Sequence, residues 1–412
     1  MIKKALFLLV IFLPCLVYCQ NTLTLDSAIQ TAYKNNTDIR TAEFKVQSAE
    51  GLKLSGLGFK KPEIFAEYEG ARGYFGDSYE TRKLGISQSF DFPSLYFLRN
   101  DVSNYSIDIA NYELVRTRSE VRYNVRIAYL NLQYNLALSD ILTKNYLLLD
   151  SLLIIAQKKL NVGIGDKLAV LDARINKTKV TADLSAAKLS IETSRKELQK
   201  LMIRDNNNFN ISEDIFDYYR RFSADNTLYD TSDTGIRNSI DYRLAVLNNN
   251  KNRASLSLAR ASWLPEFNLS YYAIKAPRNE PALINTYGVH FGITIPIWFF
   301  LDTKGQVLES QANYNSSLYA GSVTLYQVRA DINNYNRTLL TSSQKVKLYE
   351  TEILPDAGEA MNLAKSGYEL GITGYLEYLQ AQKLLLDART EYLNAISDYL
   401  KAVYAIYKIQ GK

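Results

Sequence analysis

One uninterrupted stretch, from Ser94 to Val162, constrains the fold of this chain more than any other feature. It contains no Gly and no Pro, and its apolar residues recur at the spacing of a helix face. A helix of this length would be roughly 100 Å long, whereas the usual globular helix has about 11–12 residues. Charged residues such as Arg116, Arg122 and Asp140 interrupt it, so it cannot be a membrane span. The stretch predicts a coiled coil or a helical tube.

The first 19 residues have the pattern of a secretory signal peptide. Lys3 and Lys4 are followed by an apolar run of about 13 residues, which is too short for a stop-transfer span. Without them, 46 basic and 43 acidic residues leave a net charge of +3, which argues against a nucleic-acid-binding surface. Both cysteines, Cys15 and Cys19, lie here, so we expect neither disulfides nor thiolate metal sites elsewhere. Cys19 is either a lipoprotein acceptor or part of a cleavage site. The chain is expected to be exported.

Two segments near the start, 62–69 and 83–92, change from helical to alternating periodicity. Apolar residues occupy one face of each segment and mostly polar residues the other, so both are predicted strands. A helix over 23–58 precedes them, and the long helix follows Pro93. Gly163 and Gly165 are expected to supply the positive φ angles of a tight reversal of the chain into a second helix.

The whole order of elements then repeats. With an offset of 203 residues, matching pairs are Asn35 and Asn238, Asp38 and Asp241, Arg40 and Arg243, Pro62 and Pro265, Gly85 and Gly288, and Pro93 and Pro296. Beyond the long helix the offset becomes 208, pairing Gly163 with Gly371 and Leu168 with Leu376. The five additional residues fall between strand and turn, and Pro355 suggests their place. We therefore predict a first repeat over 20–202, an irregular connector over 203–234 and a second repeat over 235–412.

Strands of about 10 residues have the length that crosses a bilayer as tilted barrel strands. Four strands cannot close a barrel, and an open sheet edge cannot lie in lipid, so membrane strands would require oligomerisation. The polar residues would then face a water-filled lumen; they include Glu63, Glu67, Ser87, Asp91 and His290. Residues where strands pass into helices suit an interfacial aromatic girdle: Trp298, Phe299 and Phe300, with Tyr96 and Phe97 in the first repeat. The alternative is a set of half-buried hairpins in a periplasmic domain.

Several short motifs occur in a fixed order within this duplicated frame. They are Leu25-Asp26-Ser27-Ala28, Asn35-Asn36, Gly85-Ile86-Ser87-Gln88, Ile353-Leu354-Pro355 and Leu370-Gly371-Ile372-Thr373-Gly374-Tyr375-Leu376-Glu377. In this order the sequence resembles the TolC-like outer-membrane efflux proteins over essentially all of the chain after the signal. No single motif decides the resemblance, but their order does.

The resemblance implies a mixed α/β membrane protein. A homotrimer would form a twelve-stranded outer-membrane β-barrel continued by a long periplasmic α-helical barrel. The implied function is a passive exit duct for small solutes in the cell outer membrane. An inner-membrane pump, expected to be of the RND type, would drive export through a periplasmic adaptor (membrane fusion) protein. The Gly-Ile-Ser-Gln strand and the short chain favour the heavy-metal branch, with heavy-metal cations as cargo.

The resemblance also implies two kinds of site. The adaptor would dock on the two helical turns, at Val162, Gly163, Ile164, Leu370, Gly371, Ile372 and Thr373. A periplasmic constriction would involve Glu377, with Gln380 where the family has a second acid; Asp172 matches Gln380 in the first repeat. Three Glu377 carboxylates around a threefold axis would form a cation-selective or pH-sensitive gate. The alternative is that Glu377 is a solvated acid on a helix face.

Competing functions remain open at this point. They are a type I secretion duct for proteins, a structural coiled-coil envelope protein or adhesin, and an outer-membrane enzyme. No nucleophile–base set, phosphate loop or metal-ligand cluster is found, so we expect neither an enzyme nor a cofactor. His290 is the only His, and a polar lumen residue is preferred over a metal ligand there.

Overall fold

The computed structural model describes residues 22–70, 81–203, 209–223, 232–275, 286–298 and 302–412. Its contacts divide the chain into two compact units. The first, here called the helical unit, contains residues 1–34, 125–224 and 352–393. The second, the sheet unit, contains residues 35–124, 225–351 and 394–412. Helices α3 (Pro93–Asn161) and α10 (Tyr375–Gln410) contribute residues to both units.

The helical unit is built from long antiparallel helices around an apolar core. Its elements are β1 (Thr22–Leu23), α1 (Leu25–Asn35), the second part of α3, α4 (Lys167–Met202), β4 (Asn210–Ile211), α5 (Ile215–Ser223), α9 (Leu354–Leu370) and the first part of α10. Leu130, Leu152, Leu198 and Leu393 are fully buried. Burial of the apolar side chains along one side of each helix, more than helix propensity, stabilises helices of this kind.

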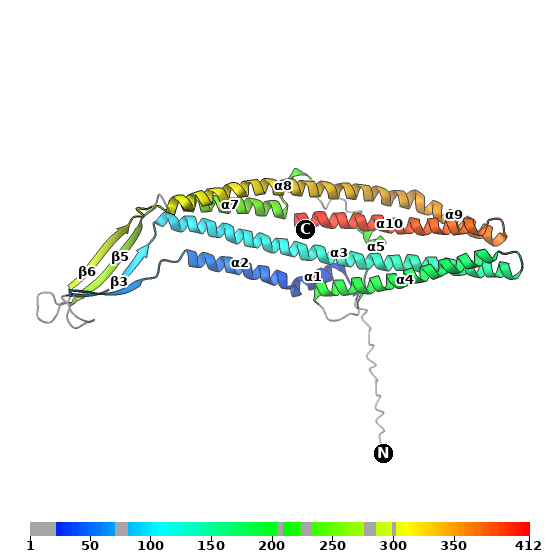
Figure 1. The fold of residues 1–412 in the computed structure, drawn as a ribbon, viewed down its shortest axis with the longest axis horizontal. Helices are drawn as coiled ribbons and strands as arrows, with labels where there is room; N and C mark the ends of the chain where they lie inside the picture. The colour runs from blue at the N-terminus through cyan, green and yellow to red at the C-terminus, as the bar shows by residue number, and fades with distance from the viewer. Residues whose placement is uncertain (1–21, 71–80, 204–208, 224–231, 276–285, 299–301) are drawn as a thin grey trace, which may run out of the picture. The chain divides into compact units, whose positions relative to one another are not determined.

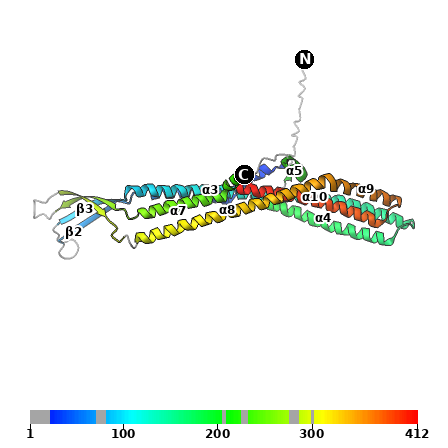
Figure 2. The ribbon, with the colours of Figure 1, turned by 90° about the horizontal axis from the view of Figure 1, so that it is seen from above.

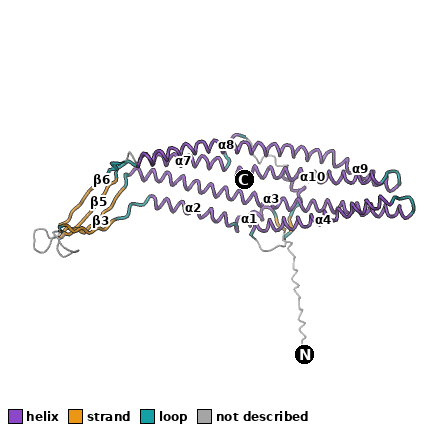
Figure 3. Tube along the Cα trace, in the orientation of Figure 1, coloured by secondary structure: helices purple, strands orange, loops and turns teal. Residues whose placement is uncertain are grey.

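The sheet unit combines four antiparallel strands with helices. Its elements are α2 (Thr37–Gly56), β2 (Glu63–Glu69), β3 (Thr81–Phe90), the first part of α3, α6 (Asp233–Arg237), α7 (Ile240–Ala261), β5 (Glu266–Lys275), β6 (Thr286–Thr294), α8 (Asp302–Leu348) and the end of α10. The sheet has the order β2-β3-β5-β6 and lies at one end of the helices of this unit (Figure 3). Helices α7 and α8 pack side by side (Figures 1 and 2).

The register of the sheet separates polar from apolar side chains. One row across the four strands consists of Glu63, Ser87, Ser270 and His290, and the next consists of Ile64, Ile86, Tyr271 and Val289. Adjacent rows point to opposite faces because side chains alternate along a strand. The predicted parity of these strands is therefore confirmed.

The long predicted helix is confirmed as the 69 residues of α3. The single helix predicted over 23–58 is wrong, because Asn36 ends α1 and begins α2. Its side chain accepts hydrogen bonds from the backbone N–H groups of Asp38 and Ile39, which caps α2. The predicted irregular connector is wrong in part, because it contains α5, which buries Ile215 and Tyr219. A nine-residue helix offers too few turns for its period to stand out in the sequence.

The structure also places the five additional residues of the second repeat. A π-helix, Tyr349–Ile353, joins α8 to α9, and together the three segments cover residues 302–370, which matches α3 in length. The additional residues therefore lie before α8 and not near Pro355. The π-helix directly precedes Leu354 and Pro355; a wider turn accommodates a residue that has no N–H to donate.

Candidate docking turns and two-faced sheet

Two reversals of the chain lie at the same end of the helical unit (Figure 1). Gly163 follows α3 and Gly371 follows α9, each with φ of 79°, a conformation that favours glycine. Ile164 N–H donates to Lys159 O at 3.0 Å, and Ile372 N–H donates to Gly367 O at 2.8 Å. These bonds satisfy carbonyls at the helix ends. The predicted turns are confirmed.

Gly165 serves a purpose other than the predicted one. Its φ is not positive, but a Cβ atom at this position would lie 2.4 Å from the backbone nitrogen of Leu160. The residue is therefore small because the returning chain passes directly against the end of α3. Asp166 then caps α4 by accepting a hydrogen bond from Leu168 N–H at 2.9 Å.

Each turn presents three large apolar side chains to solvent at equivalent positions of the repeat. All six are more than 60% exposed, and we call them the tip patch: Val162, Ile164, Leu168, Leu370, Ile372 and Leu376. Thr373 lies between them, and its hydroxyl donates to Ala364 O at 3.1 Å. A cluster of exposed apolar side chains on rigid turns is typical of a protein-binding surface.

Three tyrosines pack beneath the tip patch. The ring of Tyr368 stacks on Tyr378 at 5.7 Å and meets Tyr375 edge-on at 6.3 Å. Burial raises the pKa of all three hydroxyl groups, so they are neutral at physiological pH. Lys159 lies 4.1 Å above the Tyr368 ring and donates to the Tyr368 carbonyl. This cation–π contact connects α3 to α9 directly below the turns.

The three predicted constriction residues lie close to the second turn but in different surroundings. The carboxylate of Glu377 folds back over Gly374, where a Cβ atom would meet it at 2.5 Å. An acid in the first turn of a helix is favoured by the helix dipole. Asp172 is half-buried on α4 and interacts electrostatically with Tyr375, whereas Gln380 is exposed. Among the described residues, no ion pair or hydrogen bond joins Glu377, Gln380 and Asp172.

One face of the sheet, here the apolar face, exposes large hydrophobic side chains. Each of the following is at least 47% exposed: Ile64, Tyr68, Leu84, Ile86, Leu269, Tyr271, Tyr287, Val289, Phe291 and Ile293. The described helices contain no segment that is both long and apolar enough to cross a bilayer. Trp298, after β6, and Phe97, at the start of α3, are also strongly exposed. Phe299 and Phe300 of the predicted girdle lie outside the described residues.

The opposite face, here the polar face, is crossed by a network of small side chains. Asn268 Nδ2 donates to Ser87 Oγ at 2.9 Å and to Ser89 Oγ at 3.1 Å, and Ser270 Oγ donates to Ser87 Oγ at 3.1 Å. Nearby, Lys83 Nζ lies 2.6 Å from Glu69 and 3.7 Å from Glu67. The structure therefore places the predicted residues Glu63, Glu67, Ser87 and His290 on one face.

Asp91 has more contacts than expected for a residue of an open channel wall. It is only 5% exposed and lies between Lys60, at 3.1 Å, and Arg99, at 2.5 Å. Lys60 also pairs with Glu266. This cluster connects β5, the end of β3 and the first turns of α3, so Asp91 stabilises the sheet unit where strands and helices join.

Sequence reasoning missed an aromatic layer on the polar face. A Cβ atom at Gly85 would lie 2.7 Å from the ring of Phe65, and one at Gly288 would lie 2.4 Å from the ring of Tyr272. The two rings are 6.5 Å apart. The repeat-equivalent glycines were visible in the sequence, but nothing there showed which rings cover them.

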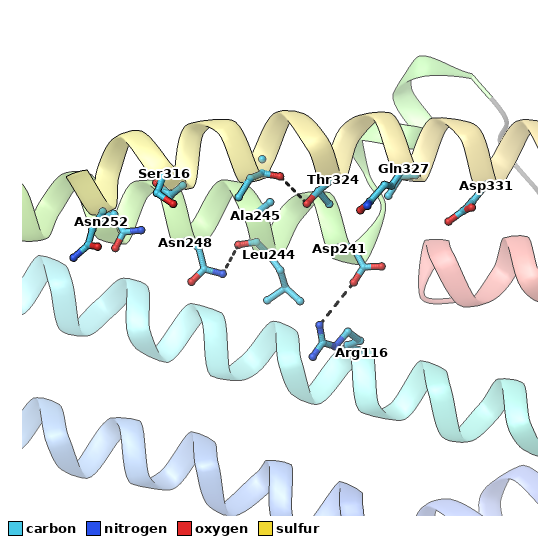
Figure 4. A pocket seen from close by; sticks show the side chains of 15 residues that line it. Arg116, Asp241, Leu244, Ala245, Asn248, Asn252, Ser316, Thr324, Gln327 and Asp331 are labelled. Carbon is cyan, nitrogen blue, oxygen red and sulfur yellow. Dashed lines mark hydrogen bonds and ion pairs between the residues drawn. The ribbon is translucent and has the colours of Figure 1, made fainter. Parts of the chain in front are cut away.

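Sequence reasoning also missed a polar groove in the sheet unit, formed by α3, α7 and α8. Its volume is about 650 Å³, and Arg116 approaches Asp241 across it at 3.9 Å (Figure 4). Asn248, Asn252 and Thr324 belong to its lining. Among the described residues, no three His, Cys, Asp or Glu side chains gather closely enough to hold a metal ion.

Comparison with known proteins places this geometry in context. Residues 235–412 match the family model described as outer membrane efflux protein. The cobalt-zinc-cadmium resistance protein CzcC of Cupriavidus metallidurans is 22% identical over 403 residues, which cover 95% of this chain and 90% of that protein. The Campylobacter jejuni outer membrane channel CmeC matches with a TM-score of 0.74 and 20% identity, covering 94% of this chain and 85% of that one. VceC of Vibrio cholerae matches with a TM-score of 0.76 and 16% identity, covering 94% and 96%. The structural similarities show the fold.

Proposed function

We propose that this chain, which is a TolC-like outer-membrane efflux protein, carries heavy-metal cations out of the cell. It is the outer-membrane exit duct of a tripartite efflux system and extends from the outer membrane into the periplasm. Such ducts are trimeric channel proteins that work with a periplasmic adaptor and an inner-membrane pump. A pump of the RND type, and lipid contact by the apolar face, are further parts of the proposal.

The observation that supports lipid contact and conduction best is the two-faced sheet. Its apolar face exposes aromatic and branched side chains, which suits lipid, and its polar face carries a hydrogen-bonded network, which suits a water-filled lumen. A hairpin domain in water would have to cover that apolar face. A conductance in planar bilayers, measured with the purified trimer, would exclude a purely structural scaffold.

Two observations favour metal cations as cargo. Three glutamates of β2, Glu63, Glu67 and Glu69, lie on the polar face, and acidic groups in a lumen favour cations. In addition, the CzcC protein that the chain resembles along 95% of its length is by its name a cobalt-zinc-cadmium resistance protein. Neither observation distinguishes one divalent metal from another.

Growth of a deletion strain on Cu, Ag, Zn and Co salts, beside bile salts and dyes, tests the cargo. We expect the deletion strain to be hypersensitive to the metal salts. Returning the intact gene should restore its growth. The double variant Glu63→Gln/Glu67→Gln should lower the cation preference in bilayers, whereas Glu309→Gln, which removes an exposed helix acid, should not. Sensitivity to the organic compounds alone would refute the metal assignment and leave a drug-efflux duct.

The tip patch is the proposed docking site for the adaptor. Small residues at Gly163 and Gly371 let a partner approach the backbone closely, and the six apolar side chains offer area to bury. Thr373 completes the second turn. Each buried apolar side chain of this size can contribute about 1.5–3 kcal/mol to association.

Binding of the purified adaptor to the trimer tests this site. Ile164→Asp and Ile372→Asp should each weaken adaptor binding by tenfold or more, because a charge replaces an apolar contact (about 1.4 kcal/mol per tenfold). Leu189→Asp, at a position on α4 that is also strongly exposed, is the control and should bind normally. Unchanged binding by both tip variants, with trimers intact, would refute the assignment.

Glu377 remains a proposed constriction residue. Its position in the helical unit near the second turn supports a gate. Its carboxylate lies over Gly374, which supports the alternative of an acid that only stabilises the first turn of the helix. Glu377→Gln distinguishes them. A gate acid should change conductance and its pH dependence, while a helix-end acid should change only stability.

A further inference from the structure

Both tryptophans of the chain lie at the end of the sheet where strands pass into helices. Trp263 precedes β5 and Trp298 follows β6, and at this end the two strands pair through Glu266 and Thr294. The two tryptophan side chains are 56% and 71% exposed. Tryptophan is enriched where a membrane protein passes from lipid tails to headgroups. The position of both residues suits that boundary.

Helix α7, which leads into Trp263, is basic. Its four basic residues are Arg243, Lys251, Arg253 and Arg260. Its one acid, Asp241, lies in the first turn, far from the sheet, and approaches Arg116 of α3. Among the described residues, neither Arg253 nor Arg260 has an ion pair, and both are exposed. The half of α7 that ends at the sheet therefore carries uncompensated positive charge.

We propose that Arg260, beside the two tryptophans, binds the headgroup phosphate of anionic phospholipids in the inner leaflet of the outer membrane. The helices leave the sheet at this end, and the duct extends into the periplasm, so the lipid at this level belongs to the inner leaflet (Figure 3). The proposal rests on the lipid contact of the apolar face proposed above, and it adds which lipid is selected and by which residues.

Arg260 is oriented by helix α8. Its Nη2 donates to Gln311 Oε1 at 3.0 Å, and Gln311 Nε2 donates to Asn315 Oδ1 at 3.1 Å. The second bond determines which end of the Gln311 amide faces Arg260. A guanidinium has five N–H donors, so several remain for a phosphate, which this planar group can bind through two parallel bonds. A helix C-terminus carries only about half a negative charge, which the full charge of Arg260 outweighs.

Apolar side chains lie where the tails of such a lipid would begin. Ser262, at the end of α7, still has helical φ and ψ, so Trp263 follows on the same side of the helix as Arg260. Beyond the end of β6, Ile295 and Ile297 are 65% and 72% exposed. A phosphate on Arg260 and tails on these side chains are the two contacts that a phospholipid requires.

The distance along α7 separates the roles of the two arginines. Arg253 lies about 10 Å farther from the sheet than Arg260, at 1.5 Å per residue. This separation is close to the Debye length of about 8 Å at physiological ionic strength, so Arg253 adds attraction without direct contact. One basic residue near an anionic surface enriches anionic lipid about fivefold, which corresponds to about 1 kcal/mol.

Fluorescence quenching tests the proposal, because Trp263 and Trp298 are the only tryptophans of the chain. The full-length trimer is reconstituted into phosphatidylcholine vesicles that contain a minor share of phosphatidylglycerol. In one preparation only the phosphatidylglycerol carries bromine on its acyl chains. In the other, an equal amount of the phosphatidylcholine carries it. Bromine quenches nearby tryptophan, so the ratio of quenching reports lipid selection at this site.

We expect brominated phosphatidylglycerol to quench as if it were enriched about fivefold around the tryptophans. Equal quenching in the two preparations would overturn the headgroup site and leave lipid contact by the apolar face intact. No quenching in either preparation would overturn both. High salt should reduce the enrichment in the native protein, because the attraction is electrostatic.

Variants of the trimer assign the selection to α7. Arg253→Gln/Arg260→Gln should make quenching by the two lipids nearly equal. Arg237→Gln, which removes an exposed arginine beyond the other end of α7, is the matched control and should keep the enrichment. Arg260→Lys should keep part of it, because the charge remains but the planar donor group is lost. Enrichment that survives in the double Gln variant would refute the role of these arginines.

Discussion

A buried amide pair tests what fixes the register of α3 against α10 in the helical unit. Gln382 donates a hydrogen bond to Asn145 Oδ1, and the two residues are 5% and 4% exposed. The amide nitrogen of Asn145 has no hydrogen-bond partner. The pair therefore gains one hydrogen bond but leaves one buried donor unsatisfied.

Replacing one partner should be costly, whereas replacing both should not. Asn145→Leu leaves the Gln382 amide buried without a partner, and Gln382→Leu does the same to Asn145. Each should lower the free energy of unfolding by about 1–3 kcal/mol. The double variant leaves neither amide behind and should lie within about 1 kcal/mol of the native protein. The coupling between the two positions should thus be at least about 1–2 kcal/mol and favourable.

The native protein, the two single variants and the double variant form a double-mutant cycle. Denaturant unfolding of the detergent-solubilised trimer, followed by far-UV circular dichroism, gives the free energy of unfolding of each of the four proteins. Lys144→Leu and Lys383→Leu change exposed neighbours on the same helices and form the control cycle, which should be additive within about 0.5 kcal/mol. If the double Leu variant lost the sum of the two single losses, the reasoning on the buried pair would be wrong. The amides would then stabilise the interface by shape and not through each other.

Three further predictions concern single side chains, each measured as the free energy of unfolding. Gly165→Ala should cost about 2–3 kcal/mol, because its Cβ atom would meet the end of α3. Gly358→Ala, in α9 with open space around it, should gain up to about 1 kcal/mol. Tyr129 donates a hydrogen bond to Leu23 O at 3.0 Å, so Tyr129→Phe should cost about 1 kcal/mol at pH 7. Burial raises the pKa of Tyr129, so the native protein should lose stability as the pH rises above about 10. The Phe variant lacks only the part of this loss that Tyr129 causes, so the difference in stability between the two proteins should narrow there.

Periodicity was enough to predict the elements that carry the fold. The absence of Gly and Pro between Ser94 and Val162 gave the long helix, and the change to alternating residues gave both faces of the sheet. The internal repeat made Gly163 and Gly371 equivalent before either φ angle was known. These features depend on residues that are close together in the sequence, at spacings of two or of three to four residues.

What could not be predicted depends on contacts between distant residues. The break at Asn36 was missed because the helical period continues through it. The new helix begins there because the Asn36 side chain accepts hydrogen bonds from backbone N–H groups. The contact of Lys159 with Tyr368, and the rings over Gly85 and Gly288, join residues far apart in the chain. Gly165 was assigned a positive φ, but its real constraint is the nearby backbone of Leu160. Spacing alone carries no information on such neighbours.

The two turns illustrate what a duplication keeps and what it lets change. The apolar side chains of the tip patch match pair by pair, as Ile164 and Ile372 do. The exposed charges around them do not match: Lys158, Asp166 and Lys167 flank the first turn and leave it net positive, whereas Glu369 and Glu377 flank the second. The turns thus offer a partner similar apolar side chains with net charges of opposite sign. Because like charges across an interface are destabilising, an adaptor that engages both turns must present acidic groups to the first and basic groups to the second.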